Sequence, residues 1–128
     1  MTPYSHQIAS KDMLRGRPAS LRGWQAYLGE DHQRDVSPYA APARVEDLSG
    51  LPPAYMMIGE LDLMRDENID YAMRLMQAGV PTELHVYPGA FHGFEGIAPN
   101  AAVSIRAVKE YTEALKRDLH RTLAEDER

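Results

Sequence analysis

Two polar residues stand where ligands and catalytic groups gather in parallel α/β sheets. Asp62 follows the apolar run 54–58, and His92 follows a second strand-like run at 82–87. The carboxyl ends of neighbouring parallel strands lie side by side at one edge of a sheet, so the two residues are expected to meet. A carboxylate beside an imidazole is the orienting pair of a Ser-His-Asp triad, in which the acid fixes the tautomer of the base.

The strands that would carry these residues can be traced in the sequence. Leu51-Pro52-Pro53 cannot extend a helix, and the continuous apolar run 54–58 that follows ends at Gly59. Such a run is typical of a strand buried on both faces. In the run 82–87, hydrophobic and polar side chains alternate before the turn at Pro88-Gly89. This alternation predicts a second strand.

Each strand is followed by a predicted amphipathic helix. Asp66 is a good N-cap for the first helix, which Gly79 and Pro81 end, and Asn100 is a good N-cap for the second, longer one. The apolar residues that recur at helical spacing are Ile69, Ala72, Met73 and Met76 in the first helix and Ile105, Val108, Tyr111, Leu115 and Leu119 in the second.

The order strand, helix, strand, helix, with short connections, predicts an α/β fold with parallel strands and flanking helices. We expect a single partial domain over residues 1–128, in which residues 46–128 form this βαβα core. Residues 1–45 form a loop-rich helical segment in front of it.

The loop-rich segment contains one predicted helix, over residues 21–28, with Ser20 as its N-cap. Residues 30–45 are expected to form an ordered loop. Trp24 and Tyr27 are interpreted as packing residues.

A sheet of two strands leaves both edges open, and isolated two-stranded pairs are marginally stable in water. The rest of the sheet must come from missing sequence, from another copy of the chain or from rearrangement of the first third. Burial of the open strands between identical chains predicts a homo-oligomer.

The sequence also resembles a known family. The motifs that carry the resemblance are Ser37-Pro38, Pro52-Pro53, the run GELDLMRDE from Gly59 to Glu67, Gly79-Val80-Pro81, Tyr87-Pro88-Gly89 and His92-Gly93-Phe94. They look like the end of the hormone-sensitive-lipase-like branch (α/β-hydrolase fold 3) of the α/β-hydrolases. The resemblance runs through most of residues 36–120.

This resemblance implies an eight-stranded, mostly parallel sheet with an overlying helical cap, next to which residues 1–45 would lie. The family hydrolyses carboxylic esters of short to medium chain length, so the implied partner is a small-molecule ester and no cofactor is implied. By motif match, Asp62 is implied as the triad acid and His92 as the base.

The sequence departs from the family at the nucleophile. The family's serine sits in Gly-x-Ser-x-Gly at a strained turn between a strand and a helix, and no serine of this chain is flanked in that way. The His-Gly-Gly-type segment that forms the oxyanion hole is absent too. We therefore expect that the chain starts after the sixth strand of the complete sheet and hydrolyses no ester on its own.

Two alternatives to an incomplete hydrolase stay open. The chain could be a non-catalytic assembly or binding module that kept this half of the fold for its surface. A partner polypeptide could also provide the serine and complete the site. An in-frame Gly-x-Ser-x-Gly just upstream of Met1 in the source DNA would favour a truncated hydrolase over the module. Co-purification of a hydrolase N-terminal half would point to the partner polypeptide.

The remaining polar residues are interpreted as structural. Asp66 and Glu67 suit the positive end of a helix dipole, and Glu60 either lines a pocket or is structural. Four histidines lack the spacing of metal ligands and are expected on the surface, namely His6, His32, His85 and His120. No metal or cofactor is predicted.

Composition excludes several classes of protein. The net charge of −5, without a clustered basic face, argues against a nucleic-acid partner. No apolar run approaches the roughly 18 residues of a membrane span. The chain has no cysteine and so no disulfide framework. No secretory signal is visible at the N-terminus, so a cytoplasmic location is expected.

Overall fold

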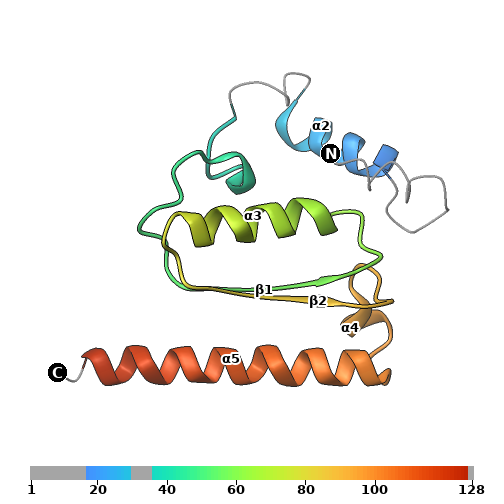
Figure 1. Ribbon diagram of the computed structural model, residues 1–128. Coiled ribbons are helices and arrows are strands. Elements are labelled where there is room, and N and C mark those ends of the chain that lie inside the picture. Colours follow the sequence, from blue (N-terminus) through green and yellow to red (C-terminus); the bar gives the residue numbers. More distant parts are fainter. Residues whose placement is uncertain (1–16, 30–35, 127–128) are drawn as a thin grey trace.

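The computed structural model describes residues 17–29 and 36–126, with side chains through residue 120. Its strands lie between two helices (Figure 1). In chain order the elements are α2 (Arg17–Leu28), the 3-10 helix η1 (Pro42–Arg44), β1 (Ala54–Gly59), α3 (Arg65–Gln77), β2 (Thr82–Tyr87), α4 (Phe94–Ile97) and α5 (Ala102–Asp126).

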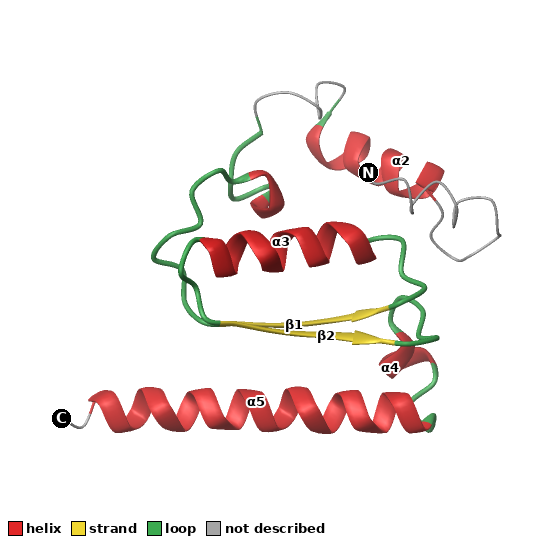
Figure 2. Ribbon diagram, viewed as in Figure 1, coloured by secondary structure: helices red, strands yellow, loops and turns green. Residues whose placement is uncertain are grey.

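The two strands form a parallel sheet, paired from Ala54 opposite Thr82 to Gly59 opposite Tyr87. Helix α3 lies along one face of the sheet and α5 along the other, and both strands point toward the same end of the molecule (Figure 2). This three-layer arrangement confirms the predicted α/β fold with a βαβα order. The described part of the first third, residues 17–29 and 36–45, adds no strand to the sheet.

Helix α3 packs on the sheet through a narrower face than the sequence suggests. Its buried residues are Ala72 and Leu75, and Leu75 forms a core with Leu48 and Val80. Met73 and Met76, predicted to be core residues, are each 48% exposed. The predicted cap is also wrong, because the helix begins at Arg65 and Asp66 lies inside its first turn.

Helix α5 packs on the sheet through small residues. Ser104, Ala107 and Ala114 are its buried positions, and Ala107 joins Tyr87, Ala90 and Phe94 in a second core. The predicted apolar stripe does not face the sheet. All five of its members are exposed, namely Ile105, Val108, Tyr111, Leu115 and Leu119. Small side chains let the helix axis approach the strands, and the large side chains are left beside the contact.

The boundaries around α5 also differ from the prediction. The helix begins at Ala102, so Asn100 lies before the position of its N-cap. A short helix that the sequence did not predict, α4, precedes it and follows Gly93, whose φ of 71° is left-handed. The Ser104 hydroxyl joins the two helices by donating to the Phe94 carbonyl at 3.1 Å.

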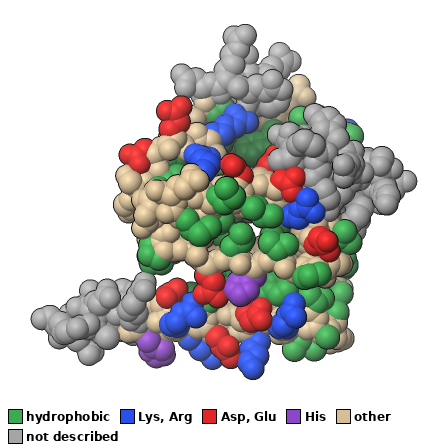
Figure 3. Space-filling model, in the orientation of Figure 1, with side chains coloured by type: hydrophobic (Ala, Val, Ile, Leu, Met, Phe, Trp, Pro, Cys, Tyr) green, Lys and Arg blue, Asp and Glu red, His purple; other side chains and the backbone are tan. Residues whose placement is uncertain are grey.

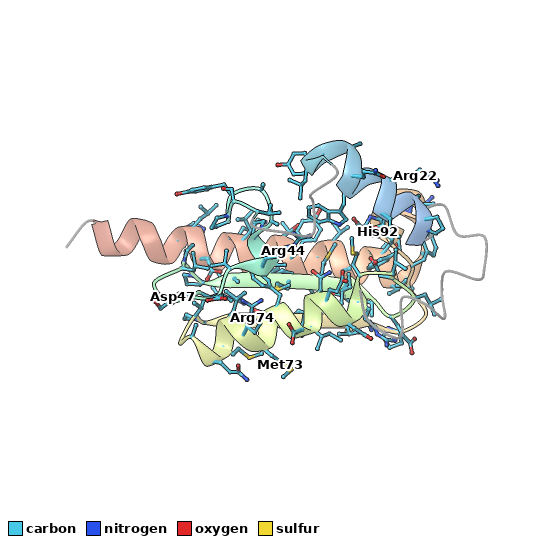
Figure 4. The ribbon with its side chains drawn as sticks, turned by 90° about the horizontal axis from the view of Figure 1, so that it is seen from above. Arg22, Arg44, Asp47, Met73, Arg74 and His92 are labelled. Atoms are coloured by element: carbon cyan, nitrogen blue, oxygen red, sulfur yellow. The ribbon has the colours of Figure 1, made fainter. Side chains whose placement is uncertain are left out.

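The first third is attached to the core through Arg74, and Arg44 links two of its own segments. On α3, the Arg74 guanidinium donates to the Ala43 carbonyl at 2.7 Å and to the Val45 carbonyl. The Arg44 guanidinium lies 5.5 Å from the ring centroid of Trp24 on α2. In Figure 4, Arg44 and Arg74 lie in the middle of the molecule, away from His92.

Helix α2 itself departs from the prediction. It begins at Arg17, so Ser20 is inside the helix and does not cap it. Tyr27 is 65% exposed, which contradicts its interpretation as a packing residue, whereas Trp24 is half-buried. Residues 30–35 of the expected loop lie outside the described residues. Among the residues described, no helix has both the length and the apolar character needed to cross a membrane.

Candidate active site

Asp62 and His92 lie together at the carboxyl end of the sheet. The Nδ1 atom of His92 is 2.8 Å from the Oδ2 atom of Asp62. The Asp62 side chain is 3% exposed, and that of His92 is 56% exposed. The predicted meeting of the two loops is therefore confirmed, with the acid buried and the base open to solvent.

The Asp62 carboxylate is fixed from within its own loop. Its second oxygen, Oδ1, accepts the Met64 N–H at 2.8 Å. The backbone of Asp62 donates to the Gly59 carbonyl and accepts the Arg65 N–H, both at 3.1 Å. The acid is thus held by the turn that leads into α3 before it orients any partner.

The loops that carry the pair are joined by their backbones. Glu60 donates its N–H to the Tyr87 carbonyl and Leu61 donates to the Ala90 carbonyl, each at 2.9 Å. Gly59 makes this approach possible, since a Cβ atom there would lie 2.4 Å from the Ala90 oxygen. A side chain at this position would force the loops apart.

The geometry defines which proton each group handles. An aspartate carboxylate only accepts hydrogen bonds, so the ring nitrogen facing it donates and Nε2 keeps a lone pair. That nitrogen belongs to an exposed side chain and is able to take a proton from a hydroxyl group. The buried carboxylate would then stabilise the imidazolium that forms.

Three other acidic residues lie near the site, at the end of β1 and in the first turn of α3. The Arg65 guanidinium donates to Asp66 Oδ1 from Nε at 2.8 Å and from Nη2 at 2.7 Å. Glu67 lies in the first turn of α3. Glu60 accepts the Gly89 N–H at 2.8 Å through its side chain. Within the described ranges, no group of three or more His, Cys, Asp or Glu residues is placed to hold a metal ion.

His85 is not the surface residue that the sequence predicted. It is half-buried between the rings of Tyr55 and Tyr87, whose centroids lie 5.2 Å and 6.1 Å from its own. Its Nε2 atom is 2.8 Å from Glu83 Oε1, and this hydrogen bond lowers the pKa of the Glu83 carboxyl. The polar side of a half-buried strand reads as solvent-facing in the sequence, but α5 covers it here. His120 is exposed as predicted, and His6 and His32 lie outside the described residues.

A partly buried polar cluster between the sheet and α5 was missed by sequence reasoning. The Tyr87 hydroxyl donates to Glu110 Oε2, and the Arg106 guanidinium lies 5.3 Å from the Tyr87 ring centroid. Burial, together with the Glu110 hydrogen bond, raises the pKa of Tyr87, and burial raises that of Tyr55. In the paired strands Tyr55 stands opposite Glu83 and Tyr87 opposite Gly59, so the strand sequences gave no signal that linked the two tyrosines.

Comparisons with known proteins agree with this fold. A sequence profile described as alpha/beta hydrolase fold matches residues 2–96. Esterase LipI of Mycobacterium tuberculosis is 36% identical over 102 residues, which are 80% of this chain and 31% of LipI. An arylesterase of Saccharolobus solfataricus is 38% identical over 97 residues, covering 70% of this chain and 31% of that enzyme.

Solved structures give the same result in three dimensions. A bacterial heroin esterase superposes with a TM-score of 0.76 at 42% identity, over 91% of this chain and 39% of that one. Esterase LipW of Mycobacterium marinum superposes with a TM-score of 0.78 at 38% identity, over 89% and 35%. These matches define an α/β-hydrolase fold. The chain belongs to the α/β-hydrolases, in their hormone-sensitive-lipase-like branch, and spans about a third of the relatives it matches.

Proposed function

We propose that this chain provides the acid and the base of a carboxylic-ester hydrolase, with Asp62 as the triad acid and His92 as the base. The observation that carries the proposal is the 2.8 Å contact between His92 Nδ1 and a buried Asp62 carboxylate. Similarity to esterases supports the reaction class, and the substrate class is a small-molecule ester. The whole enzyme's activity requires a serine from outside these 128 residues.

In this reaction the chain's own groups move one proton. His92 Nε2 takes it from the serine hydroxyl as the serine oxygen attacks the ester carbonyl, and returns it to the leaving alcohol. Asp62 holds the ring so that Nε2, and not Nδ1, faces the hydroxyl. Hydrolysis of the acyl-enzyme repeats the exchange with a water molecule as the nucleophile.

A chimera tests the roles of the two residues. The stretch of the heroin esterase that aligns with this chain is replaced by this chain, and hydrolysis of a short p-nitrophenyl ester is measured. We expect activity that falls about 10⁴-fold in the Asp62→Asn variant, as for loss of a triad acid. His92→Ala should be at least as severe. An active chimera that keeps its rate in both variants would overturn the assignment.

The same assay on the isolated chain tests the external serine. Without a nucleophile or oxyanion donors, no acyl-enzyme can form, so we expect neither turnover nor labelling by a fluorophosphonate. Saturable hydrolysis that disappears in the His92→Ala variant would show that the chain uses a serine of its own.

We also propose that the chain self-associates, as the alternative of an assembly module requires. One observation favours this proposal. The five large apolar side chains of the α5 stripe (Ile105, Val108, Tyr111, Leu115 and Leu119) are exposed. A hollow of about 450 Å³ lies along this stripe, between Ile105, Val108 and Thr112, and not at the Asp62–His92 pair. A folded 14.4 kDa monomer in sedimentation equilibrium at micromolar concentration would refute this proposal.

A further inference from the structure

The Glu60 side chain links the two loops that carry the acid and the base. Glu60 follows β1 directly, and its Oε2 atom accepts the backbone N–H of Gly89 at 2.8 Å. Gly89 belongs to the turn that leads from β2 toward His92. A carboxylate that accepts a backbone N–H forms one of the stronger hydrogen bonds found in proteins.

The turn at Gly89 has few bonds of its own. Gly89 has a φ of 70°, in the left-handed region that glycine adopts without strain. Pro88 has no N–H to donate, and the bond that spans the turn, from the Ala90 N–H to the Tyr87 carbonyl, is long at 3.3 Å. The Glu60 carboxylate therefore fixes the Gly89 N–H, for which the turn itself provides no acceptor.

The His92 ring is too exposed for burial to hold it in position. The His92 side chain is 56% exposed, whereas the Asp62 carboxylate is 3% exposed and bonded within its own loop. The position of the base thus depends on how its loop is joined to the acid's loop. Three hydrogen bonds connect the two loops. Two are donated by the backbones of Glu60 and Leu61, and one is accepted by the Glu60 side chain.

From this arrangement we infer that Glu60 is a positioning residue, which holds the His92 loop so that Nδ1 stays on the Asp62 carboxylate. The inference deepens the proposed function and rests on it. Glu60 acts on the pair through Gly89, whose backbone N–H its carboxylate accepts. Its effect is on the tautomer of the base, because only a docked ring keeps its proton on Nδ1.

The test is the tautomer ratio of His92 in the intact chain. It is measured from the ¹⁵N chemical shifts of the ring, at a pH at which the ring is neutral. The wild type should carry the proton on Nδ1. In Glu60→Ala we expect the ratio of the Nδ1–H form to the Nε2–H form to fall about tenfold, the lower end of the effect of losing one hydrogen bond to a charged group. Glu60→Gln keeps an acceptor oxygen and should restore most of the ratio.

Two further variants make the result decisive. Glu113→Ala removes a glutamate from the surface of α5, which is 63% exposed, and should leave the ratio unchanged. Asp62→Asn removes the acceptor itself and should shift the ratio more than Glu60→Ala does. An unchanged ratio in Glu60→Ala, with a shift in Asp62→Asn, would overturn the positioning role alone. An unchanged ratio in Asp62→Asn would overturn the acid–base pair, and the proposed function with it.

If Glu60→Ala fails to fold, the comparison moves to amide hydrogen exchange of Gly89 in the wild type and in Glu60→Gln. A bonded Gly89 N–H should exchange more slowly than the amide of Gly50, which has a similar φ of 71° in another turn. Exchange at the rate of an unprotected amide in the wild type would show that the carboxylate does not hold the turn.

Discussion

The loops at the strand ends and the outer side of α5 are held in opposite ways. Around Asp62, bonds within this chain fix the segment between β1 and α3, including the Met64 N–H on Oδ1 and the Leu61 N–H on the Ala90 carbonyl. On α5, large apolar side chains such as Ile105 and Leu115 are more than half exposed. The loops at the strand ends are thus held by bonds within the chain, whereas the outer side of α5 is left exposed.

This difference separates the placing of the Asp62–His92 pair from the stability of the domain around it. Two adjacent parallel strands are enough to bring the carboxylate and the imidazole together, since the bonds that do so are short-range. Covering a long helix requires a second layer of apolar surface, which these residues do not provide. In Figure 3 charged side chains gather over α5 on the visible face, and hydrophobic ones gather above it.

The substitution Gly59→Ala should disrupt the loops at the strand ends and give the largest effect. The new Cβ would lie 2.4 Å from the Ala90 oxygen and 3.1 Å from the Phe91 oxygen, and both are backbone atoms. We expect the free energy of unfolding to fall by about 3 kcal/mol, at the upper end of overpacking costs. The His92 ring should leave Asp62 at the same time. Urea unfolding and the His92 tautomer ratio measure the two effects.

Gly23→Ala is the matched control, because nothing lies within 4 Å of a Cβ atom there and the residue is inside helix α2. Alanine should raise the stability slightly, by up to about 1 kcal/mol, through its better helix propensity. Equal stability of Gly59→Ala and the wild type would mean that the two loops are not in contact.

The inner side of α5 offers a test of intermediate size. Burial and the bond to Glu110 raise the pKa of Tyr87 above the ordinary tyrosine value of about 10, and burial raises the pKa of Tyr55. A folded-state pKa above the unfolded one adds stability that is complete below about pH 10 and is lost as the pH rises past it. Each such tyrosine should steepen the decline by about 1.4 kcal/mol per pH unit.

Tyr87→Phe should therefore flatten the alkaline decline in urea stability, and it should cost about 1 kcal/mol at neutral pH through the lost hydrogen bond. Tyr39→Phe is the control, since Tyr39 is 98% exposed, and its profile should follow that of the wild type. A Tyr87→Phe profile as steep as the wild type would show that Tyr87 ionises freely in the folded chain.

Sequence patterns predicted the positions of Asp62 and His92 better than they predicted how the helices pack on the sheet. Asp62 and His92 could be placed because strand ends in a parallel sheet have a fixed neighbour relation. The rotation of each helix could not be predicted, since a stripe such as Met73 and Met76 does not show which of its flanks meets the sheet. The burial of His85 also depended on α5, which a strand's own alternation does not reveal. Nor does local periodicity show which surface is to cover Ile105 or Leu115.

The smallest expected effect on stability is at the uncovered side of α5, where the double variant Ile105→Gln, Leu115→Gln sharpens the comparison. Both side chains are nearly 60% exposed, and glutamine is a good helix former, so the free energy of unfolding of the monomer should change by no more than about 0.5 kcal/mol. Self-association through the α5 stripe should nevertheless be lost.

Sedimentation equilibrium at micromolar concentration measures the mass of this double variant beside that of Lys109→Gln. Lys109 is 72% exposed on the same helix and lines the same hollow, and its substitution should leave the association of the wild type unchanged. An oligomer that persists in the double variant would place the contact on another surface. The open edges of the two-stranded sheet would then be the next surface to test, because unpaired backbone groups there can bind a further strand.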